Sequence, residues 1–179
     1  EALHSVAHDY CLIDIERDAT IIANIHTGRS IGHKTVAEGL LSIVRRITGK
    51  GMPEETLALL HMLAEDTCST DTCAELTAAI ARAEPELVRT FADAMVELMS
   101  ARYLPSALIL LCDDALSPWL TELFSRIDFT QFTTTTRPFE VTTLDATSLA
   151  SLVTTPKDIA IDRRLLLAAA LADIEEKKG

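Results

Sequence analysis

The sequence predicts an α/β domain, in which helices pack against a mixed β-sheet that opens with an N-terminal three-stranded meander. Three observations support this prediction. Short β-branched, apolar runs come first, apolar residues at helical spacing follow, and a wholly apolar run of the buried parallel-strand type returns at 107–112. Strands and helices in this order are typical of a sheet covered by helices.

The first 36 residues predict the meander. Tyr10–Ile15 is an apolar run suited to a buried strand, and Ala19–His26 is rich in β-branched residues. The turn signal Thr-Gly-Arg-Ser at 27–30 lets the chain return as a third strand, Ser30–Val36.

Two helices are expected after the meander. The segment Leu40–Ile47 carries apolar residues on one helical face and ends near Gly49 and Gly51. A second helix begins at Met52–Glu55, because proline and early carboxylates suit the first turn of a helix.

A third helix is expected to begin with Asp71 or Thr72 as its cap and to run to about Ala101. Proline lacks the N–H that a helix interior needs, so Pro85 predicts a kink or break near Ala83.

The rest of the chain predicts a strand, a helix, a Thr- and Phe-rich strand segment and two final helices. In chain order these are Ala107–Cys112, Ser117–Ile127, Phe129–Leu144 with an edge strand at Thr133–Thr136, a short helix from Asp145 or Thr147 to Val153, and Ile159–Glu175.

Composition limits the classes of partner. The chain has 179 residues, of which 48% are hydrophobic, and a formal net charge of −11. Polyanions are usually met by clustered Lys and Arg, so this balance argues against nucleic acid and anionic membranes as partners. No apolar run is long enough to span a membrane, which excludes direct membrane insertion. The opening Glu-Ala-Leu-His suggests a domain excised from a longer chain.

Four cysteines are present, and we expect them to be reduced structural thiols. Cys11 and Cys112 lie in apolar runs, where a thiol behaves as a small buried hydrophobe. Cys68 and Cys73 lack a second matching pair for zinc, even with His61 nearby, so no metal site is expected. A disulfide between these two remains an alternative in an oxidising compartment, although nothing else in the sequence indicates secretion.

Several segments together resemble the second lobe of bacterial actin-like ATPases of the PilM and FtsA kind. In that family the first strand carries Asp-x-Gly-x-x-x-Thr, which Leu12–Thr20 matches in part. A stretch of the type Thr-Gly-Gly-Gly-Ser-x-Leu-Pro-Gly-Leu corresponds to Leu111–Leu120. Met52–Ala58 is similar to a family segment before the long helix, and Leu166–Ala172 to the final Ala-rich helix. The resemblance implies a ribonuclease H-like lobe over 1–179, with a solvated tail at 173–179.

The chain departs from the family at the positions that would bind nucleotide. Asp14 and Thr20 are retained, but Glu16 replaces the motif glycine. The three-glycine position reads Cys112-Asp113-Asp114. Glycines there let backbone N–H groups approach a phosphate, whereas side chains fill the space and carboxylates repel the phosphate. No Gly-rich phosphate loop is present elsewhere. We therefore expect no catalytic residue, no cofactor and no metal at these degenerate positions.

Two acidic groups are candidate metal or acid–base sites. Asp113 and Asp114 follow a buried strand, where α/β proteins often bind ligands. The favoured interpretation is a loop start and helix N-cap, with Asp114 near the helix N-terminus. Asp14, Glu16 and Asp18 form another acidic cluster, and magnesium binding there is not favoured because a partner motif is missing.

Three further residues have a structural and a functional interpretation. Arg45 and Arg46 are expected on a solvated helix face rather than in a ligand site. Trp119 is expected to be a packing residue, with a partner-binding anchor as the alternative.

The resemblance implies a non-catalytic, degenerate actin-like domain that acts as a cytoplasmic protein-interaction scaffold. It implies a machine at the inner membrane, for pilus or type II secretion assembly or for division, with cytosolic segments of its membrane subunits as partners and with possible homo-oligomers. The alternative is the second lobe of an active ATPase or sugar-kinase-like enzyme. A stand-alone domain of another family is a third interpretation, which a different strand order would favour.

Overall fold

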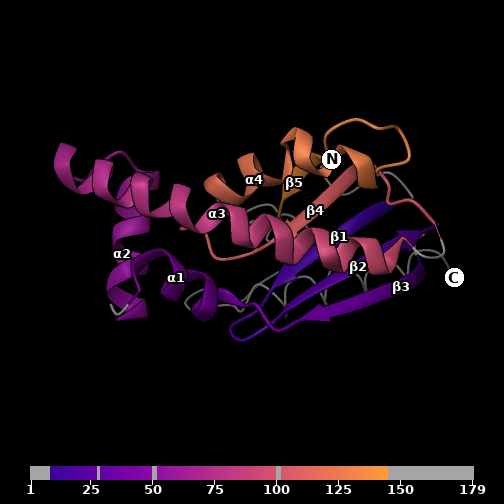
Figure 1. Cartoon of the computed structure of the whole chain (residues 1–179), viewed down its shortest axis with the longest axis horizontal. Coiled ribbons are helices and arrows are strands. Elements are labelled where there is room, and N and C mark those ends of the chain that lie inside the picture. The colour runs from indigo at the N-terminus through magenta and orange to yellow at the C-terminus, as the bar shows by residue number, and fades with distance from the viewer. Residues whose placement is uncertain (1–8, 28, 50–51, 100–101, 145–179) are drawn as a thin grey trace, which may run out of the picture. The chain divides into compact units, whose positions relative to one another are not determined.

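The computed structural model describes residues 9–27, 29–49, 52–99 and 102–144. All of these except Leu144 belong to one compact unit, Ser5–Thr143 (Figure 1). The two helices predicted after residue 144 and the predicted tail at 173–179 lie outside the described residues. The assignment of 1–179 to a single lobe stays a prediction.

Five strands form one mixed sheet. They are β1 (Tyr10–Ile15), β2 (Thr20–His26), β3 (Arg29–Val36), β4 (Ala107–Leu111) and β5 (Glu140–Thr143). Their order is β3-β2-β1-β4-β5. The pairs β1–β2 and β2–β3 are antiparallel, and the pairs β1–β4 and β4–β5 are parallel. This order confirms the predicted meander and the parallel strand that follows the helices.

Along the chain, helices follow β3 and β4 and connect each of these strands to the next one. They are α1 (Leu40–Thr48), α2 (Pro53–Ala64), α3 (Thr70–Leu98), α4 (Ser117–Phe124) and the 3-10 helix η1 (Ile127–Phe132). The predicted starts of α1 and α2 are confirmed, and the C-cap of α1 is Gly49, whose φ of 76° suits glycine. Among the described residues, none of these helices combines the length and the apolar character needed to cross a membrane.

The long helix α3 differs from the prediction at its start and at its proline. Its cap is Ser69, whose hydroxyl accepts a hydrogen bond from the amide of Thr72 at 3.4 Å, and not Asp71 or Thr72. The helix runs unbroken past Pro85, which is exposed. Buried residues on both sides of Pro85 hold the two halves of the helix against the same core, and this packing outweighs the missing hydrogen bond.

The core lies between α3 and one face of the sheet. Figure 1 shows α3 passing across the strands, with α1 and α2 near its first half. The main buried residues of this layer are Cys11, Ile13, Ile22, Leu108 and Leu110 from the sheet and Leu87, Phe91 and Met95 from α3. Alternate residues of β1 and β4 point to this face, so the strand pattern directly predicts it.

The segment after β4 is less regular than predicted. The helix expected to reach Ile127 stops at Phe124, because Phe129 and Phe132 of η1 pack back toward it. The rings of Phe124 and Phe129 are 5.3 Å apart, and those of Phe129 and Phe132 are 6.2 Å apart. Burial of these rings decides the chain path here.

The predicted edge strand Thr133–Thr136 is wrong. Thr133 is buried and makes only an isolated bridge to Leu104, while its hydroxyl donates to the carbonyl oxygens of Thr130 and Arg137. Thr136 has a φ of 52°, which a strand does not allow. The edge strand is β5 instead.

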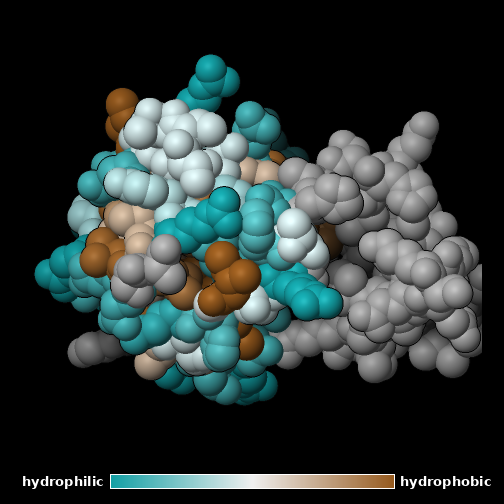
Figure 2. Space-filling model, turned by 90° about the vertical axis from the view of Figure 1, so that its right-hand side faces the viewer, coloured by the Kyte–Doolittle hydropathy of each residue, from teal (hydrophilic) through white to brown (hydrophobic). Residues whose placement is uncertain are grey.

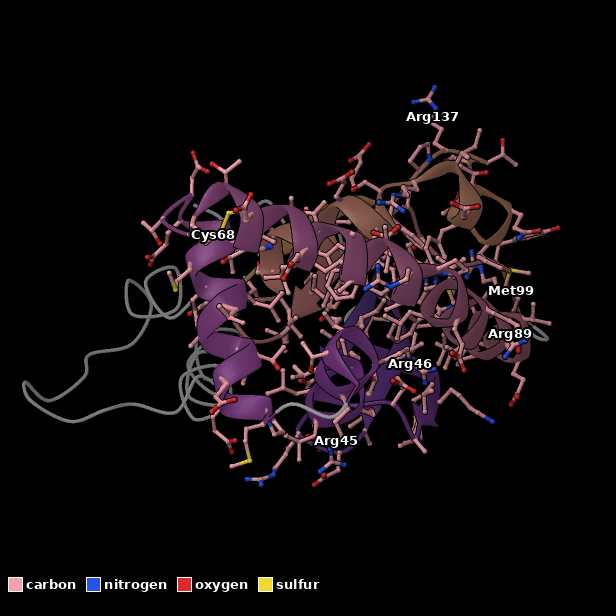
Figure 3. All side chains as sticks on the ribbon, turned by 60° about the vertical axis from the view of Figure 1, so that its left-hand side comes forward. Arg45, Arg46, Cys68, Arg89, Met99 and Arg137 are labelled. Carbon is pink, nitrogen blue, oxygen red and sulfur yellow. A yellow bond between two sulfur atoms is a disulfide. The ribbon has the colours of Figure 1, made fainter. Side chains whose placement is uncertain are left out.

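The expectation of four reduced cysteines is also wrong. Cys68 and Cys73 form a disulfide between the α2–α3 connection and the first turn of α3 (Figure 3). Their Cα atoms are 5.8 Å apart, within the range that a disulfide spans. Cys11 and Cys112 are buried and form no disulfide, as predicted.

Candidate functional site at the carboxyl ends of β1 and β4

The residues singled out by the sequence meet at one end of the sheet. β1 and β4 are parallel neighbours, with Asp14 opposite Leu111. The turn after β1 and the loop after β4 therefore leave the sheet side by side. This places Glu16 and the segment Cys112–Asp114 at the same end, where ligands bind in open α/β sheets.

Thr20 is a buried residue at this end of the sheet. It begins β2 opposite Ile15, and it is fully buried. Its hydroxyl donates a hydrogen bond to the carbonyl oxygen of Glu38, which lies just before α1. Thr20 therefore ties the hairpin to the start of α1 and has a structural role in this chain.

The turn from β1 to β2 is closed by its own backbone. The amide of Glu16 donates to the carbonyl oxygen of Ala19 at 2.8 Å. The carbonyl oxygens of Glu16 and Arg17 then accept hydrogen bonds from the amides of Leu40 and Leu41, at 2.7 and 3.0 Å. The first N–H groups of α1 thus bind the turn.

Gly39, the N-cap of α1, makes this close approach possible. A Cβ atom at this position would lie 2.3 Å from the amide nitrogen of Ala19 and 2.5 Å from the carbonyl carbon of Asp18. Free N–H groups at a helix N-terminus are suited to anions such as phosphate. In α1 the amides of Leu40 and Leu41 are occupied by carbonyl oxygens of the same chain, and so they are not available to a phosphate.

The loop after β4 is organised by Asp113. Its carboxylate accepts a hydrogen bond from the amide of Ala115 at 3.0 Å, and its carbonyl oxygen accepts from the amides of Leu116 and Ser117. Asp113 therefore shapes the turn that leads into α4, as the structural interpretation of this pair predicted. The predicted N-cap is wrong, because the N-cap position of α4 is Leu116, but Asp114 lies near the helix N-terminus as predicted.

The groups around this loop are mostly acidic. Asp113 has a histidine nearby, since Nε2 of His61 lies 3.7 Å from its Oδ1. Asp114 and Asp18 are exposed at the same end of the sheet, and Cys112 is buried and not disulfide-bonded. Within the described residues, no group of three or more His, Cys, Asp or Glu side chains could hold a metal ion.

Burial makes the thiol of Cys11 unreactive. It raises the pKa of the Cys11 thiol to about 12, and a protonated thiol is a poor nucleophile. Cys11 lies on β1, whose alternate residues face the core. Neither its environment nor its place in the sheet suggests a chemical role.

The sequence gives no sign of an ion-pair network that lies next to the β1–β2 turn. The buried carboxylate of Glu38 is 2.7 Å from the Arg46 guanidinium, which also lies 2.5 Å from Glu86 of α3. These contacts lower the pKa of Glu86 and raise that of Arg46. Figure 3 shows Arg45 pointing away from the protein while Arg46 lies against it. The expected solvated face is therefore correct for Arg45 and wrong for Arg46.

Trp119 is a packing residue, as predicted. Its indole N–H donates to Glu84 of α3 at 2.9 Å, and it packs against the core. Arg126 holds the same carboxylate through two hydrogen bonds of 2.6 and 3.1 Å, and these bonds lower the pKa of Glu84. No sequence spacing indicates this pairing, because Glu84 and Arg126 are brought together only by the fold.

Comparison with solved structures shows which known proteins share this fold. No family model and no curated protein matches the sequence. The structure is similar to ethanolamine utilization protein EutJ from Carboxydothermus hydrogenoformans, with a TM-score of 0.51 and 16% identity over 78% of this chain. It is also similar to a chain of a PilM-PilN type IV pilus biogenesis complex, with a TM-score of 0.53 and 10% identity over 93% of this chain. Both neighbours have the actin-like ATPase fold. The chain has this fold too.

The fold-level resemblance predicted from the sequence is thereby confirmed. The structure of apo psk41 ParM also matches, at 12% identity over 93% of this chain and 42% of that chain, but its TM-score of 0.46 is too low to carry an argument. The chain spans 46% of the length of each of the EutJ and PilM-PilN chains that it matches. In this chain the candidate site combines the β1–β2 turn, which backbone hydrogen bonds close, with the acidic loop after β4.

Proposed function

We propose that this chain is a non-catalytic actin-like domain that serves as a protein-interaction scaffold. The observation that carries the proposal is the seating of α1 on the β1–β2 turn, where the amides of Leu40 and Leu41 bind the carbonyl oxygens of Glu16 and Arg17. Backbone N–H groups are the main means by which such turns bind phosphates. Here the first two N–H groups of α1 already donate to carbonyl oxygens of the same chain.

The loop after β4 supports the same proposal. Asp113 uses its carboxylate to form the turn into α4, and Asp114 follows it. A carboxylate about 4 Å from a phosphate charge repels it by about 4 kcal/mol at an effective dielectric constant of about 20. Because about 1.4 kcal/mol corresponds to a tenfold change in affinity, one such contact weakens nucleotide binding by more than a hundredfold.

Partners and place in the cell form the second half of the proposal. The neighbour of known structure that covers 93% of this chain is part of a PilM-PilN type IV pilus biogenesis complex, which is an assembly of proteins. By analogy, we propose a PilM- or FtsA-like scaffold in the cytoplasm, beneath an inner-membrane machine for pilus or secretion assembly, where the Cys68–Cys73 disulfide would be an exception among cytoplasmic proteins. Its partners would be cytosolic segments of the membrane subunits. Such segments carry an excess of Lys and Arg, which suits a chain with a net charge of −11.

Nucleotide binding tests the first half of the proposal. Mg-ATP is titrated into the chain by calorimetry, and thermal unfolding is followed at the same nucleotide concentrations. We expect no heat of binding and no shift in the melting temperature at 1 mM Mg-ATP. Saturating binding would stabilise the fold by about 2.7 kcal/mol at a hundredfold excess over Kd, and that result would contradict the proposal.

Peptide binding tests the second half. Labelled peptides from the cytosolic segments of inner-membrane pilus subunits are titrated with the chain by fluorescence anisotropy. We expect saturable binding by at least one peptide and none by a scrambled peptide of the same charge. Equal binding of the native and scrambled peptides would reduce the interaction to non-specific charge attraction.

The alternative is that the chain is the second lobe of an active ATPase or sugar-kinase-like enzyme. It is favoured by one observation, the match to only 46% of each actin-like neighbour, which leaves room for a first lobe. A longer protein containing this chain would then hydrolyse ATP, and replacing Asp14 would abolish turnover. The scaffold proposal expects no turnover from that longer protein.

A further inference from the structure

A cavity of about 290 Å³ lies at the other end of the sheet from the candidate nucleotide site. Its lining includes Asp9 just before β1, Ala107 at the start of β4 and Glu140 at the start of β5. It therefore opens at the amino ends of the parallel strands. Figure 2 views the unit from the side on which α3 ends, where brown apolar residues lie among hydrophilic ones.

The floor of this cavity contains a buried amide. Asn24 lies on β2 opposite Cys11, is 3% exposed and lines the cavity. No described residue forms a hydrogen bond with its carboxamide, and no fully buried polar side-chain atom of the described residues lacks a partner, so the amide atoms are accessible from the cavity. Its donor and acceptor atoms remain available to a molecule that enters the cavity.

One side of the cavity carries three linked side chains, Asp9, His26 and Arg102, whose charges sum to zero. Asp9 accepts a hydrogen bond from the amide of Thr27 at 2.8 Å, and this bond, with the contact to His26, lowers the pKa of Asp9. Nδ1 of His26 lies 2.7 Å from Asp9, and its Nε2 lies 3.2 Å from the Arg102 guanidinium. This geometry fits the tautomer that donates to Asp9 and accepts from Arg102. The positive charge of Arg102 therefore balances the negative charge of Asp9.

Glu140 supplies the remaining charge. It lines the same cavity, and no described residue forms an ion pair with it. The hydroxyls of Ser106 and Thr134 also line the cavity, and neither donates a side-chain hydrogen bond within the described residues. Because Asp9 and Arg102 balance each other, the lining carries one net negative charge, and the side chains of Asn24, Ser106 and Thr134 offer uncharged hydrogen-bond acceptors.

We propose that this cavity binds a primary ammonium group. Such a group carries one positive charge and three donors, which match Glu140, the amide oxygen of Asn24 and the nearby hydroxyls. An alkyl stem would lie along Ile31 and Tyr103, which line the cavity and are 47% and 56% exposed. Ile31 is displaced at the bulge where the β2–β3 register shifts. A free alkylamine or a lysine side chain of a bound peptide can supply this chemistry.

Two probes distinguish these sources. n-Butylammonium presents the group alone, and acetyl-Gly-Lys-Gly-amide presents it on a peptide; n-butanol and the norleucine peptide are the uncharged counterparts. Binding is followed by NMR through the side-chain amide signals of Asn24. We expect saturable shifts with both charged probes and none with the uncharged ones. At least tenfold tighter binding of the peptide would assign the site to a protein partner, and the reverse order to a free amine.

Matched variants separate this site from general attraction to an acidic protein. Glu140→Gln removes the proposed charge, whereas Glu55→Gln removes the same charge from exposed α2, outside the cavity lining. We expect the first variant to raise Kd at least tenfold and the second to leave it within twofold. Equal effects of both variants, or no saturation by either charged probe at 20 mM, would overturn the proposal.

Asn24→Leu supplies an independent readout. Loss of an unpartnered amide should keep or raise the melting temperature, while the loss of the acceptor should raise Kd at least tenfold. A purely structural asparagine would instead lower the melting temperature and leave Kd unchanged. If this variant does not fold, the comparison of Glu140→Gln with Glu55→Gln decides the proposal alone.

Discussion

Gly39 lies in direct contact with the backbone of Asp18, so that the N-terminus of α1 closes over the β1–β2 turn. A Cβ atom on Gly39 would lie 2.5 Å from the Asp18 carbonyl carbon. This contact joins residues 21 positions apart (39 − 18), and it decides which backbone groups remain free at the candidate nucleotide site.

Replacing Gly39 by alanine should destabilise the protein by about 2 kcal/mol, the typical cost of forcing an extra carbon into a packed position. The colliding atoms belong to the backbone, so the turn or the helix must move. Urea denaturation measures the loss. Gly32→Ala is the control, because its Cβ would meet only Leu98 Cδ2, at an ordinary 3.7 Å. Equal stabilities of the two variants would show that α1 is not seated on the turn.

Replacing Arg46 by methionine should cost about 3 kcal/mol, because it leaves the buried carboxylate of Glu38 without a partner. Arg45→Met removes the same charge from the neighbouring exposed position and should change stability by less than about 0.5 kcal/mol. Chemical denaturation of both variants gives the comparison. The double variant Glu38→Gln with Arg46→Met should recover part of the loss, and a strictly additive result would argue against the pair.

The sequence predicts the parts of this fold that depend on local pattern. The apolar runs of β1 and β4 and the turn signal at 27–30 lead to the correct strands, because alternation and turn chemistry act over a few residues. The same reasoning places Glu16 and Asp113 at one end of the sheet, since residues that follow parallel neighbouring strands emerge together. Pattern therefore gives the location of the candidate site.

Pattern does not give the contacts that define the site. The bonds from α1 to the hairpin turn and the Glu38–Arg46–Glu86 network join segments that meet only after folding. Pro85 shows the same effect in a helix, because burial on both sides overrides a local breaker. Asn24 is a further case: a polar residue within an apolar strand gives no sign in the sequence that it lines a cavity.

The disulfide predicts a measurable thiol count. Alkylation of the unfolded, non-reduced protein should modify Cys11 and Cys112 only, and reduction beforehand should add two more labels. Mass spectrometry counts the labels, and four without reduction would contradict the disulfide. Replacing Cys68 and Cys73 together by serine should cost about 2 kcal/mol, as expected for a cross-link that closes a loop of about six residues.

Acid should weaken the fold through Glu84. Hydrogen bonds from Arg126 hold the pKa of Glu84 below its ordinary value of 4.5, so the unfolded state binds more protons than the folded state as the pH falls past that value. The stabilising contribution is therefore present above pH 4.5 and is lost as the pH falls through the folded pKa. Melting temperatures from pH 3 to pH 7 should fall less steeply on acidification for Glu84→Gln than for the unmodified protein. Glu122→Gln is the control, because Glu122 is 75% exposed and lies 3.6 Å from the same arginine. If this variant reduces the pH dependence of the melting temperature as much as Glu84→Gln does, the effect comes from the general surroundings of Arg126 and not from its pair with Glu84.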